Sequence, residues 1–293
     1  MKIDTSAFLV AEKETVDVTA RPTILPPLYK SEDDYKDELE DRVEAISKLQ
    51  QRLYASDGQS LLVILQAMDT GGKDGLIRHV MTGITPFGIR VSSFGRPSEM
   101  ELKHDFLWRT SLELPPKGTI GVFNRSYYEE VLVVRVHSEV LQSQHLPQKI
   151  KDDPDIWKNR FQSIRNHERH LRRNGYKVVK LFLNISKEEQ RKRLLDRIED
   201  HEKTWKFKAA DLAEREHWDE YMIAYSEAIT ATSTDNAPWY VLPGDDKLNT
   251  RLYAAQIIHD ALKELDPHYP ELSLEEKAEL ERCRAELVAQ AKS

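Results

Sequence analysis

A glycine-rich segment carries the first residues whose types and spacing suit chemistry. Residues 61–75 read LLVILQAMDTGGKDG, in which an aliphatic run leads into two glycines and a lysine. Glycines let backbone N–H groups turn towards an anion, a following helix adds its N-terminal dipole, and Lys73 supplies a point charge for a phosphate. The alternative is an ordinary glycine turn between a strand and a helix. The predicted phosphate-binding residues of this loop are Thr70, Gly71, Gly72, Lys73 and Asp74.

The loop departs from the P-loop pattern G-x-x-x-x-G-K-[ST] at two positions. Ala67 replaces the first glycine, and Asp74 replaces the Ser or Thr whose hydroxyl binds Mg²⁺. Asp69 is then the nearest hard oxygen ligand, and Mg²⁺ takes few protein carboxylates beside water and phosphate oxygens. We therefore predict that Asp69 binds Mg²⁺, or Mn²⁺ in its place, and that Asp69 and Lys73 are catalytic. The alternative role of Asp69 is to stabilise its own turn.

A second polar cluster follows the third predicted strand, where residues 123–130 read FNRSYYEE. In open α/β sheets, ligands bind at the carboxyl ends of the strands. Asn124 stands where P-loop enzymes place a metal-orienting acid, and Arg125 is suited to stabilise a transferring phosphoryl group. We predict Arg125 as catalytic and Asn124 and Glu129 as phosphate- or nucleotide-binding, with Glu129 or Glu130 as a water-mediated metal partner. The alternative is that Asn124 and Arg125 only cap the next helix.

Positive charge is concentrated in the middle of the chain. Lys151 to Arg197 contains 14 Lys or Arg and 7 Asp or Glu, whereas Glu32 to Glu44 contains 8 acids and 2 bases. A channel lined with positive groups suits a substrate with many phosphates, although a solvated face is the alternative for a single helix. The predicted channel residues are a ridge on helix 155–173 (Lys158, Arg165, Arg169 and Arg172) and Arg193, Arg197 and Lys206 beyond it.

The composition is that of a globular protein of 293 residues, of which 40% are hydrophobic. The sequence contains no apolar run approaching the roughly 20 residues of a membrane helix. The N-terminus, MKIDTSAFLVAEKE, lacks the pattern of a secretory signal. The single cysteine, Cys283, cannot form an internal disulfide, which favours the cytoplasm. The net charge of −7 argues against nucleic acid as a partner, and we expect no membrane partner.

Alternating strands and helices position both polar clusters at strand ends. The predicted strands are 61–67, 89–94, 119–124, 177–185 and 239–244. The predicted helices are 31–56, 73–81, one from the capping box at 98–101, a short one after 126, 155–173, 186–199, 246–265 and 274–291. This order predicts a three-layer α/β/α sandwich around a parallel five-stranded sheet. We expect one domain (1–293) with an N-terminal surface arm and helix (1–58) and a polar helical lid at about 200–220.

Five blocks together resemble a known family. In chain order they are LQAMDTGGKDGLIRHVMTGI, SFGRPSEMELKHDFLWR, GVFNRSYYEEVLVVRVH, TWKFKAADL and TSTDNAPWYVLP. Over about residues 31–270 the sequence resembles the polyphosphate kinase 2 family, most closely its class III branch, which acts on AMP and ADP. The resemblance implies a P-loop fold like that of nucleotide monophosphate kinases, Mg²⁺, inorganic polyphosphate, and adenine or guanine nucleotides. It also matches Arg135 and Lys206 to basic positions of the family. Other branches commonly carry Asp at the position of Asn124, which gives Asp69 more weight as the metal ligand.

The implied mechanism is direct in-line transfer of a terminal phosphoryl group between polyphosphate and a nucleotide. A phosphate nucleophile is already ionised at neutral pH, so no general base is required, and catalysis consists of placement and charge neutralisation. Two alternatives are an ATP-dependent small-molecule or nucleotide kinase on the same fold and a non-catalytic polyphosphate-binding protein. We also expect a homo-oligomer, with the C-terminal helix packed internally or against a partner copy.

Overall fold

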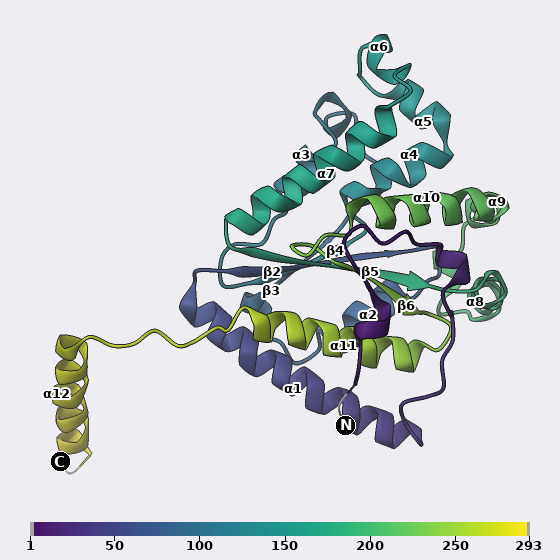
Figure 1. The fold of residues 1–293 in the computed structure, drawn as a ribbon. Helices are drawn as coiled ribbons and strands as arrows, with labels where there is room; N and C mark the ends of the chain where they lie inside the picture. The colour runs from purple at the N-terminus through teal and green to yellow at the C-terminus, as the bar shows by residue number, and fades with distance from the viewer. Residues whose placement is uncertain (1–2, 292–293) are drawn as a thin grey trace.

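The computed structural model describes residues 3–291, and its sheet has six strands in the order β1-β6-β5-β2-β4-β3. Figure 1 shows the sheet between its helical layers. The five predicted strands are confirmed within two residues at each end, and they pair in parallel. The predicted strand number is wrong, because a two-residue N-terminal strand pairs antiparallel with β6. The bounds are β1 Leu9–Val10, β2 Ser60–Ala67, β3 Ile89–Ser93, β4 Ile120–Asn124, β5 Tyr176–Asn184 and β6 Trp239–Pro243.

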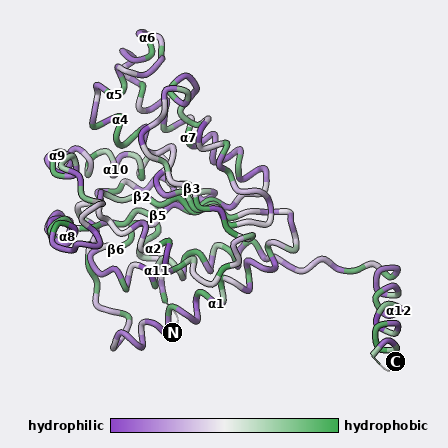
Figure 2. Tube along the Cα trace, turned by 180° about the vertical axis from the view of Figure 1, so that it is seen from behind, coloured by the Kyte–Doolittle hydropathy of each residue, from purple (hydrophilic) through white to green (hydrophobic). Residues whose placement is uncertain are grey.

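Helices cover both faces of the sheet, so the predicted α/β sandwich is confirmed. β2 is buried along its whole length, as expected for an aliphatic strand between two helical layers. One face packs against α1 (Glu32–Ser56), α2 (Lys73–Val80) and α11 (Lys247–Glu264). The other packs against α7 (Ile156–Arg173), α10 (Trp218–Thr232) and the 3₁₀ helix η5 (Tyr127–Val131). Figure 2 shows the hydrophobic residues concentrated in the strands between these layers.

The remaining helices are short or peripheral. They are α3 Trp108–Ser111, α4 Val133–Val136, α5 Ser138–Ser143, α6 Gln148–Lys151, α8 Lys187–Glu199, α9 Ala210–Glu216, α12 Leu274–Gln290, and the 3₁₀ helices η1 Ser6–Phe8, η2 Val18–Ala20, η3 Pro86–Gly88, η4 Glu101–Lys103 and η6 Thr204–Lys206. Within residues 3–291, no helix has the length and hydropathy needed to cross a membrane. Because β2, β4, β5 and β6 run in the same direction, their carboxyl ends meet at one edge of the sheet.

The N-terminal arm is more than a surface segment, which corrects the prediction for residues 1–30. The side chains of Val10, Val16 and Val18 are buried against the layer that contains α10. The Val16 N–H donates to Thr230 Oγ1 (2.9 Å), and the buried Asn184 side chain donates to the Val18 carbonyl (3.0 Å). The arm therefore closes one edge of the sheet and satisfies polar groups that its removal would expose.

Two predicted helical segments are shorter than expected. The Ser98–Glu101 capping box forms, but its helix η4 ends after one turn, and the Asp105 side chain accepts a bond from the Leu107 N–H (3.0 Å) in the following turn. The predicted lid at 200–220 contains η6 and α9, whereas Trp218 already begins the buried helix α10. The predicted polar lid is thus limited to about residues 200–217.

The C-terminal helix α12 extends away from the sandwich (Figure 1). All described residues from 268 to 291 are exposed, so the structure excludes the first of the two alternatives for this helix, internal packing, and packing against a partner copy stays a prediction. We expect a chain truncated after Glu271 to lose only the helical far-UV signal of α12 and to keep a Tm within about 2 °C of the full chain at low protein concentration, because no apolar surface is uncovered. A much larger fall in Tm would show that α12 stabilises the sandwich or an assembly, and light scattering would tell the two apart.

Candidate functional site

The glycine loop between β2 and α2 adopts a conformation that its two glycines make available. A Cβ at Gly71 would lie 2.5 Å from the Ala67 Cβ, and Gly72 has a φ of 99°, in the left-handed region. The Gly71 N–H donates to the Met68 carbonyl (3.0 Å), and the Gly72 carbonyl accepts the bond from Leu76 N–H (2.9 Å) that opens α2. The loop therefore wraps tightly and delivers the helix N-terminus to the cavity, as the sequence predicts.

Lys73 lies at the first position of α2 and is buried, with 8% of its surface exposed. Its Nζ donates to the carbonyls of Ala67 (2.9 Å) and Met68 (3.4 Å), within its own loop. Burial, together with the nearby Arg125 charge, lowers the pKa of Lys73 to about 8. An incoming phosphate would give this ammonium an anionic partner and raise its pKa again.

This pKa predicts an alkaline limit to substrate capture. Lys73 of the free protein loses its proton as the pH rises through about 8. We therefore expect kcat/KM for a phosphorylated substrate to fall above about pH 8, while kcat, which reports the complex, falls at higher pH. Steady-state rates between pH 6 and 10 test this. The Lys73→Arg variant should lose the alkaline limit because a guanidinium keeps its proton, and an identical pH profile in that variant would contradict the assignment.

Arg125 connects the two predicted clusters. Its Nη2 lies 2.6 Å from Asp69 Oδ1, and its Nη1 lies 3.1 Å from Glu129 Oε2. The Glu129 carboxylate, and to a smaller extent that of Asp69, keeps the Arg125 pKa above its ordinary value against the effect of burial. The guanidinium is thus held at the loop by two carboxylates and stays charged.

Asn124 and Asp74 link the end of β4 to the start of α2. The Asn124 Nδ2 donates to Asp74 Oδ1 (2.8 Å), and Asn124 pairs with Leu65 of β2 in the sheet. Thr70 has a φ of 62°, and its buried hydroxyl has no hydrogen-bond partner among the residues that the structure describes. A buried polar atom without a partner indicates a position where a ligand or water completes the bonding.

Arg193 supports the loop from α8. Its guanidinium donates to the carbonyls of Thr70 (3.2 Å), Gly244 (2.7 Å) and Asp245 (3.0 Å), and its Nε donates to Glu189 (2.7 Å). Arg193 lines the cavity. Its N–H groups donate to the protein atoms just named, so the phosphate-binding role predicted for it stays a prediction. Arg193 therefore holds the glycine loop to the loop that follows β6.

These elements enclose a polar cavity of about 470 Å³ at the carboxyl edge of the sheet. Of the described residues that line it, eight are basic, four are acidic, and only Leu76 and Leu183 carry aliphatic side chains. The basic ones are Lys73, Arg125, Arg193, Arg197, Lys203, Lys208, Lys247 and Arg251, and the acidic ones are Asp69, Asp74, Asp196 and Asp211. A cavity of this kind suits a polyanion rather than an uncharged ring.

Some predicted residues lie elsewhere. Glu129 contacts Arg125 from behind the lining, and Arg135 forms an ion pair with Glu227 (2.6 Å) beside the Trp157 ring. The side chain of Lys206 lies outside the described part of the chain. In the described lining no residue comes from α7, so the predicted basic ridge of that helix does not face the cavity.

Sequence reasoning missed one wall of the cavity. Lys247 and Arg251 stand four residues apart on α11, directly after β6, and therefore lie on the same face of the helix. The strand-end rule that located Asp69 and Arg125 applies equally to β6 and would have drawn attention to these two residues. Asp211, on α9, faces the loop from the lid; burial and then the Asp69 charge raise its pKa.

The donor atoms at the loop fit a hard divalent cation bound in part by its substrate. Asp69 and Asp74 supply carboxylate oxygens and Thr70 a buried hydroxyl, which are ligand types that Mg²⁺ accepts. Within residues 3–291, there is no group of three His, Cys, Asp or Glu side chains arranged to hold a metal alone.

Comparisons with known proteins place this geometry in a family. The family model described as "Polyphosphate kinase 2 (PPK2)" matches residues 29–270. An ADP-polyphosphate phosphotransferase of Rhodopseudomonas palustris is 51% identical over 98% of this chain and 100% of that protein. An AMP/ADP-polyphosphate phosphotransferase of Meiothermus ruber is 46% identical over 77% of this chain and 80% of that protein.

A solved structure shares the fold as well. The crystal structure of a polyphosphate kinase 2 from Arthrobacter aurescens TC1 superposes with a TM-score of 0.86 at 37% identity, covering 97% of this chain and 96% of that one. The family match spans the glycine loop, the Arg125 turn and the α11 wall, which together form the cavity. This chain therefore belongs to the polyphosphate kinase 2 family and is a polyphosphate-dependent nucleotide phosphotransferase.

Proposed function

We propose that the chain moves a terminal phosphoryl group between inorganic polyphosphate and AMP or ADP by direct in-line transfer, with Asp69, Lys73 and Arg125 at the reacting phosphate. The observation that carries this proposal is the cavity lining of eight basic side chains with only two aliphatic ones among the described residues. Since a nucleobase needs apolar or stacking surface, the cavity is suited to bind the polyphosphate chain. The nucleotide would then approach from the side of Asn124 and Arg125.

In this mechanism the protein binds, orients and neutralises charge. An ionised oxygen on the nucleotide's terminal phosphate attacks the last phosphorus of polyphosphate, the bridging P–O bond breaks, and the shortened chain leaves with the electron pair. Lys73 exchanges its loop carbonyl partners for phosphate oxygens, and Arg125 stabilises the charge that develops during transfer. When bound at Asp69, Mg²⁺ would neutralise part of the charge on the phosphate oxygens.

The lid supplies further contacts to the polyphosphate chain. Lys203 and Lys208 reach the cavity from the lid segment, and Asp211 lies 3.7 Å from Arg197 of α8. The C-terminal end of the lid, in α9, is held by two contacts of Glu214 Oε2. It contacts His137 Nε2 (3.0 Å) and accepts a bond from the Tyr221 hydroxyl (2.7 Å). We propose that closure of this segment excludes water, which would otherwise consume the phosphoryl group by hydrolysis.

The donor test separates this function from its alternatives. Purified protein with ADP, long-chain polyphosphate and Mg²⁺, without ATP, should form ATP, and chelation of the metal should stop the reaction. An absence of ATP under these conditions, together with phosphoryl transfer from added ATP to a small molecule, would favour an ATP-dependent kinase. Polyphosphate binding without either reaction would favour a binding protein.

The nucleotide range is tested by a time course from AMP and polyphosphate. We propose that ADP appears first and ATP follows, which agrees with the AMP/ADP-polyphosphate phosphotransferase of Meiothermus ruber. The ADP-polyphosphate phosphotransferase of Rhodopseudomonas palustris favours a second possibility, in which ADP is phosphorylated and AMP is not. A reaction that starts from ADP but not from AMP would support the second. GMP and GDP in parallel test the base range, Mn²⁺ in place of Mg²⁺ tests the metal, and light scattering tests the homo-oligomer that we propose.

A further inference from the structure

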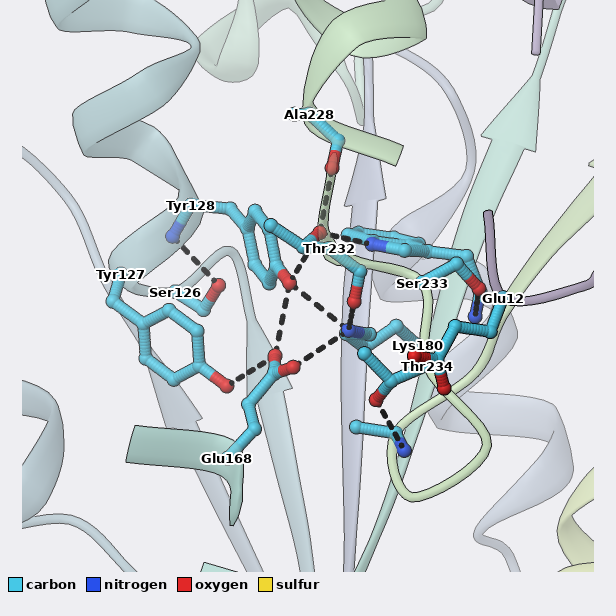
Figure 3. Close-up of polar contacts among 12 residues, drawn as sticks. Glu12, Ser126, Tyr127, Tyr128, Glu168, Lys180, Ala228, Thr232, Ser233 and Thr234 are labelled. Atoms are coloured by element: carbon cyan, nitrogen blue, oxygen red, sulfur yellow. Dashed lines mark hydrogen bonds and ion pairs between the residues drawn. The ribbon is translucent and has the colours of Figure 1, made fainter. Parts of the chain in front are cut away.

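A buried polar cluster around Lys180, shown in Figure 3, includes the two tyrosines that follow the Arg125 turn. None of its residues belongs to the described lining of the cavity. Lys180, on the central strand β5, is fully buried, and its Nζ donates to Glu168 Oε2 (2.8 Å), the Tyr128 hydroxyl (3.0 Å) and the Thr232 carbonyl (2.8 Å). These bonds use all three protons of the ammonium group. The cluster therefore joins β5, α7, η5 and the C-terminal end of α10 at one point.

The second oxygen of Glu168 holds the two tyrosines of η5. Glu168 Oε1 accepts bonds from the hydroxyls of Tyr127 (3.0 Å) and Tyr128 (2.9 Å), and the Tyr128 hydroxyl also lies 2.8 Å from Thr232 Oγ1. Burial, and then the Glu168 charge, raise the pKa of both tyrosines well above the ordinary value, so both keep their protons. Figure 3 shows both rings directed at this carboxylate.

The turn that these tyrosines anchor is strained at Arg125. Arg125 has a φ of 64°, a conformation that residues other than glycine rarely adopt and that the surrounding structure must enforce. On one side the Arg125 N–H donates to the Leu65 carbonyl (3.0 Å). On the other side, Ser126 Oγ accepts bonds from the Tyr128 N–H (3.1 Å) and from Gln66 (3.3 Å).

Packing alone does not account for charged groups at this place. Apolar side chains of similar volume at positions 180 and 168 would fill the same space, and replacing both members of a buried ion pair in this way is often neutral for stability. Hydrogen bonds, in contrast, fix the orientation of the groups that they join. Here they fix the orientation of the Tyr128 ring, three residues after Arg125. The guanidinium of Arg125 meets its two carboxylates at 2.6 and 3.1 Å, a fit that depends on where this turn is held.

We infer that Lys180, Glu168 and the Tyr128 hydroxyl are positioning residues, which hold the Arg125 turn so that its guanidinium reaches the transferring phosphoryl group. This inference rests on the proposed function, in which Arg125 stabilises the charge of that group. The cluster acts through Arg125 and has no contact of its own with substrate.

The first test compares two Tyr→Phe variants of the whole protein. Tyr128→Phe keeps the ring and removes only the hydroxyl from the cluster. We expect kcat for ATP formation from ADP and polyphosphate to fall about tenfold, with both KM values within about twofold of wild type. The matched control is Tyr176→Phe, which removes a hydroxyl that donates to the Pro115 carbonyl (3.0 Å) at the start of β5; this variant should keep the wild-type kcat. Equal losses in both variants, or a change confined to KM, would overturn the inference.

A double-mutant cycle tests whether the hydroxyl acts through Arg125. The Arg125→Lys variant and its residual kcat serve as the reference. Adding Tyr128→Phe to this variant should change kcat less than about twofold, because a lysine cannot contact both Asp69 and Glu129 as the guanidinium does. If Tyr128→Phe lowers kcat by the same factor with and without Arg125, the cluster is purely structural and the inference fails.

Hydrogen exchange gives a readout that does not depend on activity. In Tyr128→Phe, the amides of residues 124–130 should exchange faster, since the turn that fixes the Arg125 N–H to Leu65 is loosened, while those of 60–64 keep their protection. Unchanged exchange at 124–130 would also overturn the inference. If wild type makes no nucleoside triphosphate from polyphosphate, the proposed function fails, and the exchange result still decides whether the cluster holds the turn.

Discussion

Lys73→Ala is expected to lower kcat about a thousandfold or more while the protein stays folded. The variant loses the only ammonium group at the first turn of α2, where the loop carbonyls of Ala67 and Met68 hold it at the cavity. The transferring phosphoryl group then loses one of the positive partners that the proposed mechanism gives it, and its transition state is destabilised. Initial rates of ATP formation at saturating ADP and polyphosphate measure the effect.

The control for this variant is a lysine removed from the surface. Lys48→Ala on α1 removes an exposed group that pairs with Glu44, and its kcat should match wild type. Far-UV spectra and Tm values must show that Lys73→Ala is folded; its Tm should not fall, because a buried ammonium is removed from a site that lowers its pKa. A kcat within about tenfold of wild type would remove Lys73 from the catalytic set.

Lys180→Met is expected to destabilise the protein by about 3–5 kcal/mol, because it leaves the Glu168 carboxylate buried without its cation. The Lys180 side chain is fully buried and that of Glu168 is 2% exposed, so water cannot replace the lost partner. Urea unfolding gives the free energy of unfolding, with Lys48→Met on the surface as the control. An unchanged midpoint would show that Glu168 becomes protonated at little cost.

The paired variant Lys180→Met/Glu168→Gln separates the effect of the buried charge on stability from the effect of the cluster on the position of the Arg125 turn. Without the buried carboxylate, most of the lost stability should return. Its kcat should nevertheless stay below that of wild type, because the Tyr128 hydroxyl has lost its cationic partner. Recovery of both stability and kcat would mean that apolar packing can hold the Arg125 turn equally well.

The sequence predicts the sheet and the phosphate loop because both leave a local signal. Continuous aliphatic residues indicate strands buried on both sides, and GGK between such a strand and a helix indicates an anion site. The two-residue β1 leaves no such signal, since its strand conformation comes from pairing with β6. The capping box at Ser98 also shows the limit of local signals: its two hydrogen bonds form, but the chain turns away after one helical turn.

Contacts between distant residues were harder to predict. Arg135 matches a basic family position, but its partner Glu227 lies 92 positions later in the chain, and only the fold shows that the two meet. Trp205 and Trp239 are both large aromatic residues that the sequence favours as core, yet the first is 76% exposed on the lid and the second is 1% exposed beneath α10. The basic ridge of α7 follows helical periodicity, which gives a face but not what that face meets.

The two ends of this chain differ in whether a fusion partner or tag can be attached without disturbing the sheet. β1 is part of the sheet, so a fusion partner placed before Leu9 would disturb the edge strand that pairs with β6. The far end is a capped helix whose described residues all face solvent, separated from the sandwich by an extended segment. An affinity tag, a fluorescent label or an immobilisation linker therefore belongs after α12, on the opposite side of the molecule from α8 and α9, whose residues line the cavity.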